Sequence, residues 1–221
     1  AAEDPPAELE IATGGARLVV DMGNAQKTGA YLDQQHNRGR VATHSREGDV
    51  LDAFSYTGGF AIACLHGGAR RATLIDSSPD ALKLAEREAA SNGVAERCRF
   101  VVANVFDELR VVRDAGTRFD LVVLDPPKFV HSADQVTAGS RGYKDINMLG
   151  LALVRPGGVL ATFSCSGHVD AALFQKIVAG AAVDAGRTAQ ILERLSQPPD
   201  HPVATEFPEA DYLKGLILRV H

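Results

Sequence analysis

Residues 49–63 read Asp-Val-Leu-Asp-Ala-Phe-Ser-Tyr-Thr-Gly-Gly-Phe-Ala-Ile-Ala, and the rest of the chain is organised around them. This order predicts a short apolar strand, a turn of small residues and the start of an apolar helix. Paired glycines between a strand and a helix are typical of a nucleotide-binding turn. The next predicted strand, residues 71–76, stops on Asp76, where a carboxylate can accept hydrogen bonds from both hydroxyls of a ribose.

The residues of this turn favour one kind of nucleoside over another. They do not match the Gly-x-Gly-x-x-Gly pattern of dinucleotide sites, and the strand carries a carboxylate, Asp52, near its end. A carboxylate repels phosphates but attracts a cationic, amino-acid-bearing nucleoside. The turn therefore predicts S-adenosylmethionine as the ligand, with a dinucleotide such as NAD as the alternative.

Length and composition are those of an ordinary globular chain. For 221 residues, the most economical division is a main domain (47–221) preceded by a small hairpin-and-helix extension (1–46). No apolar run reaches the roughly eighteen residues that a membrane span needs. Three cysteines without metal-ligand spacing predict a reduced, cytoplasmic compartment and no metal site. The net charge of −5 argues against a broad nucleic-acid-binding face but leaves room for a local basic groove.

Strands and helices alternate along most of the chain. The predicted strands are 49–52, 71–76, 100–103, 119–124, 159–163 and 188–195, with helices between them and Pro156-Gly157-Gly158 as the stop of a long helix. A last strand, 214–220, follows the sixth without a helix. We therefore predict an α/β fold, a doubly wound Rossmann-like sheet that is mostly parallel with one antiparallel strand. Residues 9–13 and 17–21 predict an N-terminal β-hairpin around Gly14-Gly15.

Four segments with chemically useful side chains follow the carboxyl ends of these strands: 52–59, Asp76, 125–128 and 164–166. Ligands of doubly wound sheets bind beyond the carboxyl ends of the strands. The four segments are therefore predicted to form one site.

Residues 26–40 precede the sheet and allow two interpretations. A turn at Gly29 followed by a polar run predicts a helix that presents Asp33, Asn37 and Arg40 on one face. The pattern alone favours a solvated helix that caps the sheet. The alternative is a segment that covers the cofactor.

Seven motifs, in order along nearly the whole chain, resemble the class I S-adenosylmethionine-dependent methyltransferases. They lie at residues 27–34, 54–60, 125–129, 141–145, 164–166, 200–202 and 212–215. Within that class the chain looks most like the bacterial 23S ribosomal RNA 5-methylcytosine methyltransferases of the large-subunit methyltransferase I type. It departs from them at Ala30 and Gln35, where the family usually has a bulkier aromatic residue and an arginine. It also has no match to the family's N-terminal PUA RNA-binding domain.

The resemblance implies a cofactor, a partner and a set of site residues. The cofactor is S-adenosyl-L-methionine and the partner is RNA, 23S ribosomal RNA above all, while a homodimer is left open. The implied cofactor-binding residues are Lys27, Thr28, Tyr31, Asp33, Asp52, Ser55, Tyr56, Thr57, Gly58, Gly59, Phe60, Asp76, Ser77, Asn104, Val105, Asp125 and Pro126. For Asn104, contact with the adenine is weighed against a plain helix-capping role.

The chemistry of cytosine carbon 5 requires a nucleophile, and Cys165 is the candidate. Carbon 5 is a weak nucleophile until a thiolate adds to carbon 6. Cys165 follows a predicted strand and precedes a predicted helix, which favours its thiolate, as a nearby Lys128 would. Cys64 and Cys98 are predicted to be core residues.

By resemblance, Asp125 holds the base near its ring nitrogen and exocyclic amine. The predicted substrate contacts are Lys128, Arg141, Lys144 and His201, with Arg38 and Arg40 as further candidates for binding phosphates. A target base inside a folded RNA must be swung out of its stack to reach such a site.

Two other functions stay open at this point. Asp-Pro-Pro-x-Phe at 125–129 also resembles the motif of enzymes that methylate an amine or a guanine nitrogen, which need no thiol. A module that binds S-adenosylmethionine without turnover is the other alternative.

Overall fold

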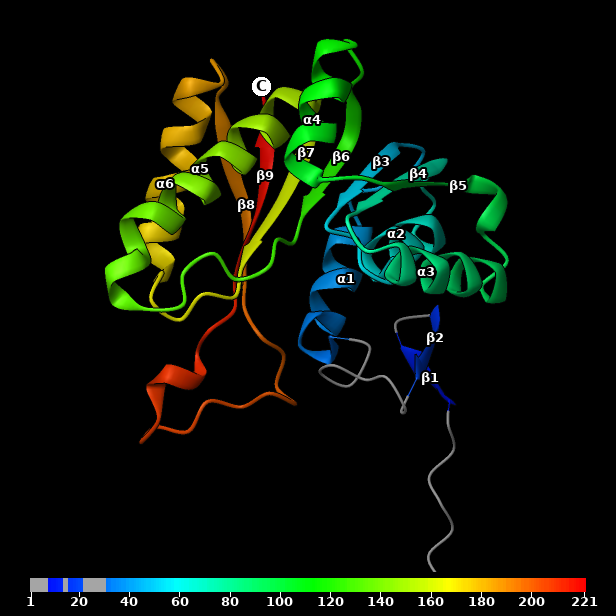
Figure 1. Ribbon diagram of the computed structural model, residues 1–221, viewed down its shortest axis with the longest axis horizontal. Coiled ribbons are helices and arrows are strands. Elements are labelled where there is room, and N and C mark those ends of the chain that lie inside the picture. Colours follow the sequence, from blue (N-terminus) through cyan, green and yellow to red (C-terminus); the bar gives the residue numbers. More distant parts are fainter. Residues whose placement is uncertain (1–7, 14–15, 22–30) are drawn as a thin grey trace, which may run out of the picture.

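The structure, a computed structural model, describes residues 8–13, 16–21 and 31–221 (Figure 1). Its helices and strands follow one another in the order β1 (Glu8–Thr13), β2 (Ala16–Asp21), η2 (Leu32–Gln34), α1 (Gln35–Ala42), β3 (Asp49–Ala53), α2 (Gly59–His66), β4 (Arg71–Asp76), α3 (Pro79–Ser91), η3 (Ala95–Arg97), β5 (Cys98–Val102), α4 (Val105–Asp114), β6 (Phe119–Leu124), η4 (Ala133–Gln135), α5 (Val136–Leu153), β7 (Val154–Ser164), α6 (Ala171–Asp184), β8 (Ala189–Leu195), η5 (Pro208–Ala210) and β9 (Lys214–Val220).

Seven strands form one mixed sheet in the order β5-β4-β3-β6-β7-β9-β8. The strands β3 to β7 pair in parallel, and β9 runs antiparallel to both of its neighbours. The predicted fold class, a doubly wound sheet with one antiparallel strand, is therefore confirmed. The last strand does not lie at the edge of the sheet. It separates β7 from β8, because the crossover from β7 through α6 to β8 skips one strand position, which β9 then fills.

Two layers of helices sandwich the sheet (Figure 1). Residues of α4, α5 and α6 pack into one core cluster on one face. Residues of α1, α2 and α3 pack into the other. The central strands β3 and β6 are buried along nearly their whole length, as expected of parallel strands that are covered on both faces of the sheet. The predicted hairpin is present as β1 and β2, which pair antiparallel, and β2 lies next to α2 and α3.

Local sequence signals fix where the helices begin. The hydroxyl of Ser78 accepts a hydrogen bond from the backbone N–H of Ala81 at 3.2 Å, and Pro79 follows at the first helical position, so α3 starts where the sequence predicts. The carboxylate of Asp170 does the same for α6 by accepting from the N–H of Leu173 at 2.7 Å.

The largest difference between a predicted boundary and the structure is the start of β7, at Val154 and not at Val159. The helix α5 ends at Leu153, and Pro156-Gly157-Gly158, predicted as its stop, already lies inside the long strand β7. The pairing of β6 with β7 shifts register between Phe119–Val154 and Leu121–Val159. The extra residues bulge out of the sheet at Gly157, which has a φ of 81° that glycine adopts without strain. The sequence signal for a turn is therefore real, but it marks a bulge and not the end of the helix.

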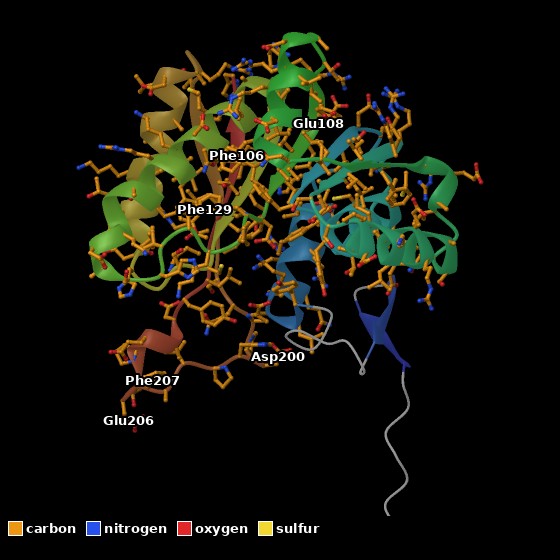
Figure 2. All side chains as sticks on the ribbon, in the orientation of Figure 1. Phe106, Glu108, Phe129, Asp200, Glu206 and Phe207 are labelled. Atoms are coloured by element: carbon orange, nitrogen blue, oxygen red, sulfur yellow. The ribbon has the colours of Figure 1, made fainter. Side chains whose placement is uncertain are left out.

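Between β8 and β9, residues 196–213 form an arm that extends away from the sheet (Figure 1). Gln197 anchors its base, because its amide donates to the carbonyls of His201 and Ala210 and accepts from the N–H of Tyr212. Figure 2 shows Asp200, Glu206 and Phe207 along this arm, with Phe207 near its tip.

Candidate active site

The turn after β3 has the backbone conformation of a tight ligand-binding loop. Phe54 and Tyr56 adopt φ values of 61° and 49°, in the left-handed region that non-glycine residues rarely adopt. Gly58 follows with a φ of 79°, and a Cβ atom there would lie 2.8 Å from a methyl group of Leu74. The glycine is therefore required both for the conformation and for the close packing of the turn against β4.

Asp52 lies at the base of this turn and is fully buried. Its Oδ2 accepts a hydrogen bond from the N–H of Ala61 at 2.9 Å, while its Oδ1 has no hydrogen-bond partner among the residues that the structure describes. Burial raises the pKa of Asp52 from its ordinary 3.8 to about 7, opposed by the Ala61 N–H and by Arg38. A buried carboxylate oxygen without a donor suits a ligand that brings one, as the ammonium group of S-adenosylmethionine does.

Asp76 ends β4 beside the turn. Its Oδ2 accepts from the N–H of Tyr56 and its Oδ1 from the N–H of Ser78, both at 2.9 Å. Each carboxylate oxygen has a further lone pair, so both can still accept from ribose hydroxyls. Asp76 thus joins the turn after β3 to the start of α3 and faces the predicted ribose position.

Tyr31 and Asp33 reach the same region from the segment before α1. The ring of Tyr31 lies edge-on to that of Tyr56, with centroids 5.1 Å apart. Asp33 accepts a hydrogen bond from the hydroxyl of Tyr212 at 2.7 Å, which connects this segment to the base of the arm. Lys27 and Thr28 lie outside the described residues.

The other predicted cofactor contacts fall into two groups. Ser55, Thr57, Gly59, Phe60 and Val105 are buried, and Ser77 is exposed beside Asp76. Asn104 is the N-cap of α4, where its side-chain oxygen accepts from the N–H of Asp107 at 3.3 Å. In this structure the side-chain oxygen of Asn104 therefore caps α4, as the second of the two interpretations predicted.

The loops that follow β6 and β7 lie side by side, since the two strands pair in parallel. The first carries Asp125 and Pro126, and the second carries Cys165. The N–H of Val130 donates to Ser166 Oγ at 3.3 Å, and the hydroxyl of Tyr143 is 2.8 Å from the same oxygen. Ser166 therefore ties the Asp125 loop to the Cys165 loop.

A cluster of aromatic rings packs against the end of the Asp125 loop. Phe129, at the end of the Asp125 loop, packs on Tyr143 with ring centroids 4.7 Å apart and also contacts Phe54 and Phe106. Figure 2 shows Phe106 and Phe129 close together between α4 and α5. Gly142 sits against the same ring, so the loop is packed and not loosely exposed.

Cys165 is half-buried, and none of the three cysteines forms a disulfide. It is electrostatically coupled to Tyr31, Tyr143, Tyr212 and Lys214. Lys214 stands opposite Ser164 in the sheet and donates from Nζ to the carbonyl of Ser166 at 2.8 Å. The ammonium group is held at the residue after Cys165, and an electrostatically coupled cation favours a thiolate.

Among the described residues, Gln34 is the hydrogen-bond donor to the side chain of Asp125. Gln34 Nε2 donates to Asp125 Oδ1 at 3.0 Å. Burial raises the pKa of Asp125 to about 7, and this effect outweighs the opposing influence of Arg38 and of the Gln34 hydrogen bond. Asp125 can therefore hold or release a proton near neutral pH.

The predicted substrate contacts have different surroundings. Lys128 is exposed on the Asp125 loop, and Arg141 is exposed in the second turn of α5. Lys144 forms an ion pair with Asp184 at 2.7 Å, at the end of α6 that points away from the site. His201 Nδ1 lies 2.9 Å from Asp200 on the arm.

Arg38 and Arg40 do not present free charges to a phosphate. Arg38 is buried, with its guanidinium 6.0 Å from the ring centroid of Phe60 and in the space where a Cβ of Gly59 would lie. Arg40 pairs with Glu193 of β8 at 2.8 Å. The predicted polar face with Asn37 is also wrong, because Asn37 is buried. In α1, Asn37 and Arg38 are packed inward, whereas Arg40 is exposed.

Three site residues escape sequence reasoning. Gln34 and Lys214 lie within recognised motifs but carry no role predictable from spacing, and Asn37 looks like a surface residue. Their contacts join positions 91 and 48 residues apart in the chain, for Gln34–Asp125 and Lys214–Ser166. The sequence signal that could have indicated their burial is the amide-rich run Gln34-Gln35-His36-Asn37. Uncharged polar side chains are buried more readily than lysines.

Within residues 31–221 and the described strands before them, no three His, Cys, Asp or Glu side chains are grouped so as to hold a metal ion. No helix in the described part of the chain is long and apolar enough to cross a membrane.

Comparison with known families and proteins gives a consistent result. A family described as S-adenosylmethionine-dependent methyltransferase matches residues 2–219. Curated relatives named ribosomal RNA large subunit methyltransferase I include one from Aeromonas salmonicida, 50% identical over 218 residues, and one from Klebsiella pneumoniae, 49% identical over 219 residues. These matches cover 98% and 99% of this chain and 55% of each relative. The chain thus spans about half the length of the curated relatives it matches.

Solved structures share the fold at lower sequence identity. SMU.776, solved in complex with SAH, superposes with a TM-score of 0.88 at 23% identity and covers 99% of this chain and 57% of its own. The Methanocaldococcus jannaschii tRNA m1G37 methyltransferase superposes with a TM-score of 0.67 at 21% identity, over 100% of this chain and 59% of its own. At such identities the likeness is one of fold.

Proposed function

The chain belongs to the S-adenosylmethionine-dependent methyltransferase family, and from that premise we propose that it methylates carbon 5 of a cytosine in 23S ribosomal RNA. The predicted family is confirmed, and with it S-adenosylmethionine as the cofactor. The names of the relatives support a large-subunit ribosomal RNA substrate. Because the chain spans about half of each relative, the activity and the substrate are part of the proposal, as is a cytoplasmic location.

The observation that carries the proposal is the pairing of a thiol with a carboxyl group of raised pKa beside the cofactor turn. Cys165 and Asp125 follow neighbouring strands, and Ser166 ties their loops together. The turn after β3 is next to them, since β3 pairs with β6 on its other side. Direct methylation of nitrogen needs no thiol, whereas carbon 5 of cytosine does.

In this proposal the residues of the chain divide the work. The Cys165 thiolate adds to carbon 6 of the base, forms a C–S bond and makes carbon 5 nucleophilic. When bound, S-adenosylmethionine supplies the electrophilic methyl group. After transfer, the carbon 5 proton leaves to a base or a water, the C–S bond breaks, and the ring and the thiolate are restored. Asp125 holds the ring nitrogen and exocyclic amine throughout, and Lys214 stabilises the thiolate form.

The residues around the turn fit the cofactor. The orphaned Oδ1 of Asp52 would accept from its ammonium group, and Asp76 would accept from its ribose hydroxyls. The Tyr31–Tyr56 pair would cover the bound nucleoside from the α1 side. The N–H groups at the start of α2 face the same turn.

Mass spectrometry of nucleosides tests the proposal most directly. Unmodified 23S ribosomal RNA is treated with the protein and with S-adenosylmethionine carrying a labelled methyl group, then digested. The expected product is labelled 5-methylcytidine. Label found in a methylated guanosine or in an exocyclic amine would overturn the carbon 5 assignment.

Two alternatives remain distinguishable. Asp125-Pro126-Pro127 with Phe129 also suits an amine or guanine-nitrogen methyltransferase, and that enzyme would produce the second result above. A module that binds the cofactor without turnover would transfer no label to any nucleoside. The presence of Cys165 and Lys214 together favours carbon 5 over both.

A further inference from the structure

Two buried amide side chains link α1 to the loop after β6. Asn37 Nδ2 donates to Gln34 Oε1 at 2.7 Å, and Gln34 Nε2 donates to Asp125 Oδ1 at 3.0 Å. We propose that Gln34 and Asn37 are positioning residues that hold Asp125 Oδ1 in a fixed hydrogen bond and leave Oδ2 to face the target base. This inference rests on the proposed function in one respect, the contact between Asp125 and the base.

Burying the side-chain amides of Gln34 and Asn37 destabilises the fold unless their polar atoms are hydrogen-bonded. Gln34 is 3% exposed and Asn37 is 1% exposed. A buried amide without partners is destabilising, so buried polar side chains are normally hydrogen-bonded. An isolated capping helix would place apolar residues here.

Asn37 decides which end of the Gln34 amide meets Asp125. Because Asn37 donates to Gln34 Oε1, the NH2 end of Gln34 is directed at the carboxyl group. The opposite orientation would place two oxygens against each other. Asn37 lies in the first turn of α1, three residues after the N-cap Gln34, and this helical spacing places the two side chains next to each other.

The hydrogen bond from Gln34 distinguishes the two oxygens of Asp125. An N–H donor needs an acceptor oxygen, so when Asp125 is neutral its proton lies on Oδ2. Oδ2 then donates to the ring nitrogen of cytosine and accepts from the exocyclic amine, and once its proton has moved to the ring nitrogen it accepts from both N–H groups. A neutral amide directs the carboxyl group without forcing its ionisation, which a lysine or arginine in contact would do.

Other charges also act on Asp125 and must be separated from the effect of Gln34. Arg38, one turn further along α1, favours the ionised form, and Asp33 opposes it. Asp52 from β3 and Tyr31 are also electrostatically coupled to Asp125. A Gln34 variant leaves all four of these groups in place. Any change in the titration of Asp125 therefore reports on the hydrogen-bond relay that runs from Asn37 through Gln34 to Asp125.

The titration of Asp125 in the full chain tests the inference without requiring turnover. The protein is labelled with 13C at the side-chain carboxyl groups of aspartate, and the Asp125 signal is identified by its loss in Asp125→Asn. The hydrogen bond from Gln34 favours the ionised form of Asp125, and Gln34→Leu removes it. The midpoint of the Asp125 titration is therefore expected to rise by about half a pH unit or more. Gln35→Leu is the matched control, because the neighbouring residue makes no contact with Asp125, and its midpoint should equal that of the wild type.

A second variant and a kinetic measurement protect the test against misfolding. Asn37→Ala keeps Gln34 but removes its orienting donor, and it should raise the midpoint in the same direction by a smaller amount. In both variants the affinity for S-adenosylhomocysteine, measured by calorimetry, should stay within about twofold of the wild type. Single-turnover methylation should lose rate more than RNA affinity and shift its pH profile with the Asp125 midpoint.

The outcomes separate this inference from the proposed function. An unchanged midpoint in Gln34→Leu, with cofactor affinity intact, would overturn the relay even if the wild type forms 5-methylcytidine. A raised midpoint with no 5-methylcytidine from the wild type would support the relay as a device acting on Asp125 and reject the proposed function instead.

Discussion

At the scale of single residues, the environment separates the three cysteines. Cys64 is buried in α2 and desolvation raises the pKa of its thiol far above the ordinary value. Burial raises the pKa of Cys98 to about 11. Cys165 follows the carboxyl end of β7 and is electrostatically coupled to Lys214. Burial thus disfavours a thiolate at Cys64 and at Cys98, which leaves Cys165 as the candidate nucleophile of the proposed function.

Cys165→Ala should abolish methyl transfer while leaving cofactor affinity nearly unchanged, because one small residue replaces another. It should also abolish the covalent adduct that the wild type forms with RNA containing 5-fluorocytosine, where fluorine blocks the final elimination. Denaturing gel electrophoresis with labelled RNA detects the adduct. Cys64→Ala and Cys98→Ala should keep it. Methylation by Cys165→Ala near the wild-type rate would contradict the covalent mechanism.

Asp52 should make the stability of the cofactor-free protein depend on pH. Its folded pKa of about 7 exceeds the unfolded value of 3.8, so its contribution is fully present below pH 3.8 and is lost as the pH rises through about 7. The free energy of unfolding should fall across this window, by about 1–3 kcal/mol from Asp52. Urea denaturation at about pH 5 and pH 8 measures the fall.

Asp52→Asn should flatten this pH dependence because the amide does not titrate and can still accept from the N–H of Ala61. Asp80→Asn is the control, since Asp80 is 92% exposed and should leave the wild-type slope. Asp125 contributes with the same sign and remains in both variants. A slope in Asp52→Asn equal to that of the wild type would show that Asp52 is not the source.

At the scale of elements, the segment before β3 and the arm before β9 meet over the site. The hydroxyl of Tyr212 donates to Asp33, although the two residues are 179 positions apart in the chain. The segment also carries Tyr31 against Tyr56 of the cofactor turn. For residues 31–40, the described part of the segment, this arrangement supports the interpretation as a cover for the cofactor.

Tyr212→Phe should weaken the binding of S-adenosylhomocysteine by about two- to tenfold, since the variant loses one hydrogen bond to a carboxylate and retains the ring. Isothermal titration calorimetry measures the change. Phe207→Ser, near the tip of the arm and 59% exposed, is the control and should bind like the wild type. If both variants bind S-adenosylhomocysteine as tightly as the wild type, residues 26–40 only cap the sheet.

At the scale of the whole molecule, a net charge of −5 leaves RNA binding to local groups of cations. Lys128 and Arg141 are exposed near the carboxyl ends of the strands, on the Asp125 loop and in the second turn of α5. Lys144 is neutralised by Asp184 at the opposite end of α6. The RNA face that we propose therefore surrounds the loops after β6 and β7.

Lys128→Ala and Arg141→Ala should each weaken RNA binding and reduce the slope of log affinity against log salt by about 0.7–0.9, as the loss of one phosphate contact does. Lys144→Ala is the matched control and should keep the wild-type slope. Fluorescence anisotropy with an RNA fragment at several salt concentrations measures these slopes. A reduced slope in Lys144→Ala alone would move the RNA face to the outer side of α5 and α6.

The sequence by itself determined the order of the strands and helices and the positions of the chemical groups at strand ends. Asp52, Asp76, Asp125 and Cys165 each follow or end an apolar run. Chain direction in a parallel sheet brings such ends to one edge. These are local properties, because hydrophobic patterning and turn residues act over a few positions.

Tertiary structure alone decided which polar residues are buried and what they contact. Gln34, Asn37 and Arg38 have the pattern of a solvated helix, yet they face the carboxylates of Asp52 and Asp125. The place of β9 between β7 and β8 was likewise decided by pairing across the sheet. The physical reason is that burying a polar side chain is favourable only when a distant partner satisfies it, and the identity of that partner is not encoded in nearby residues.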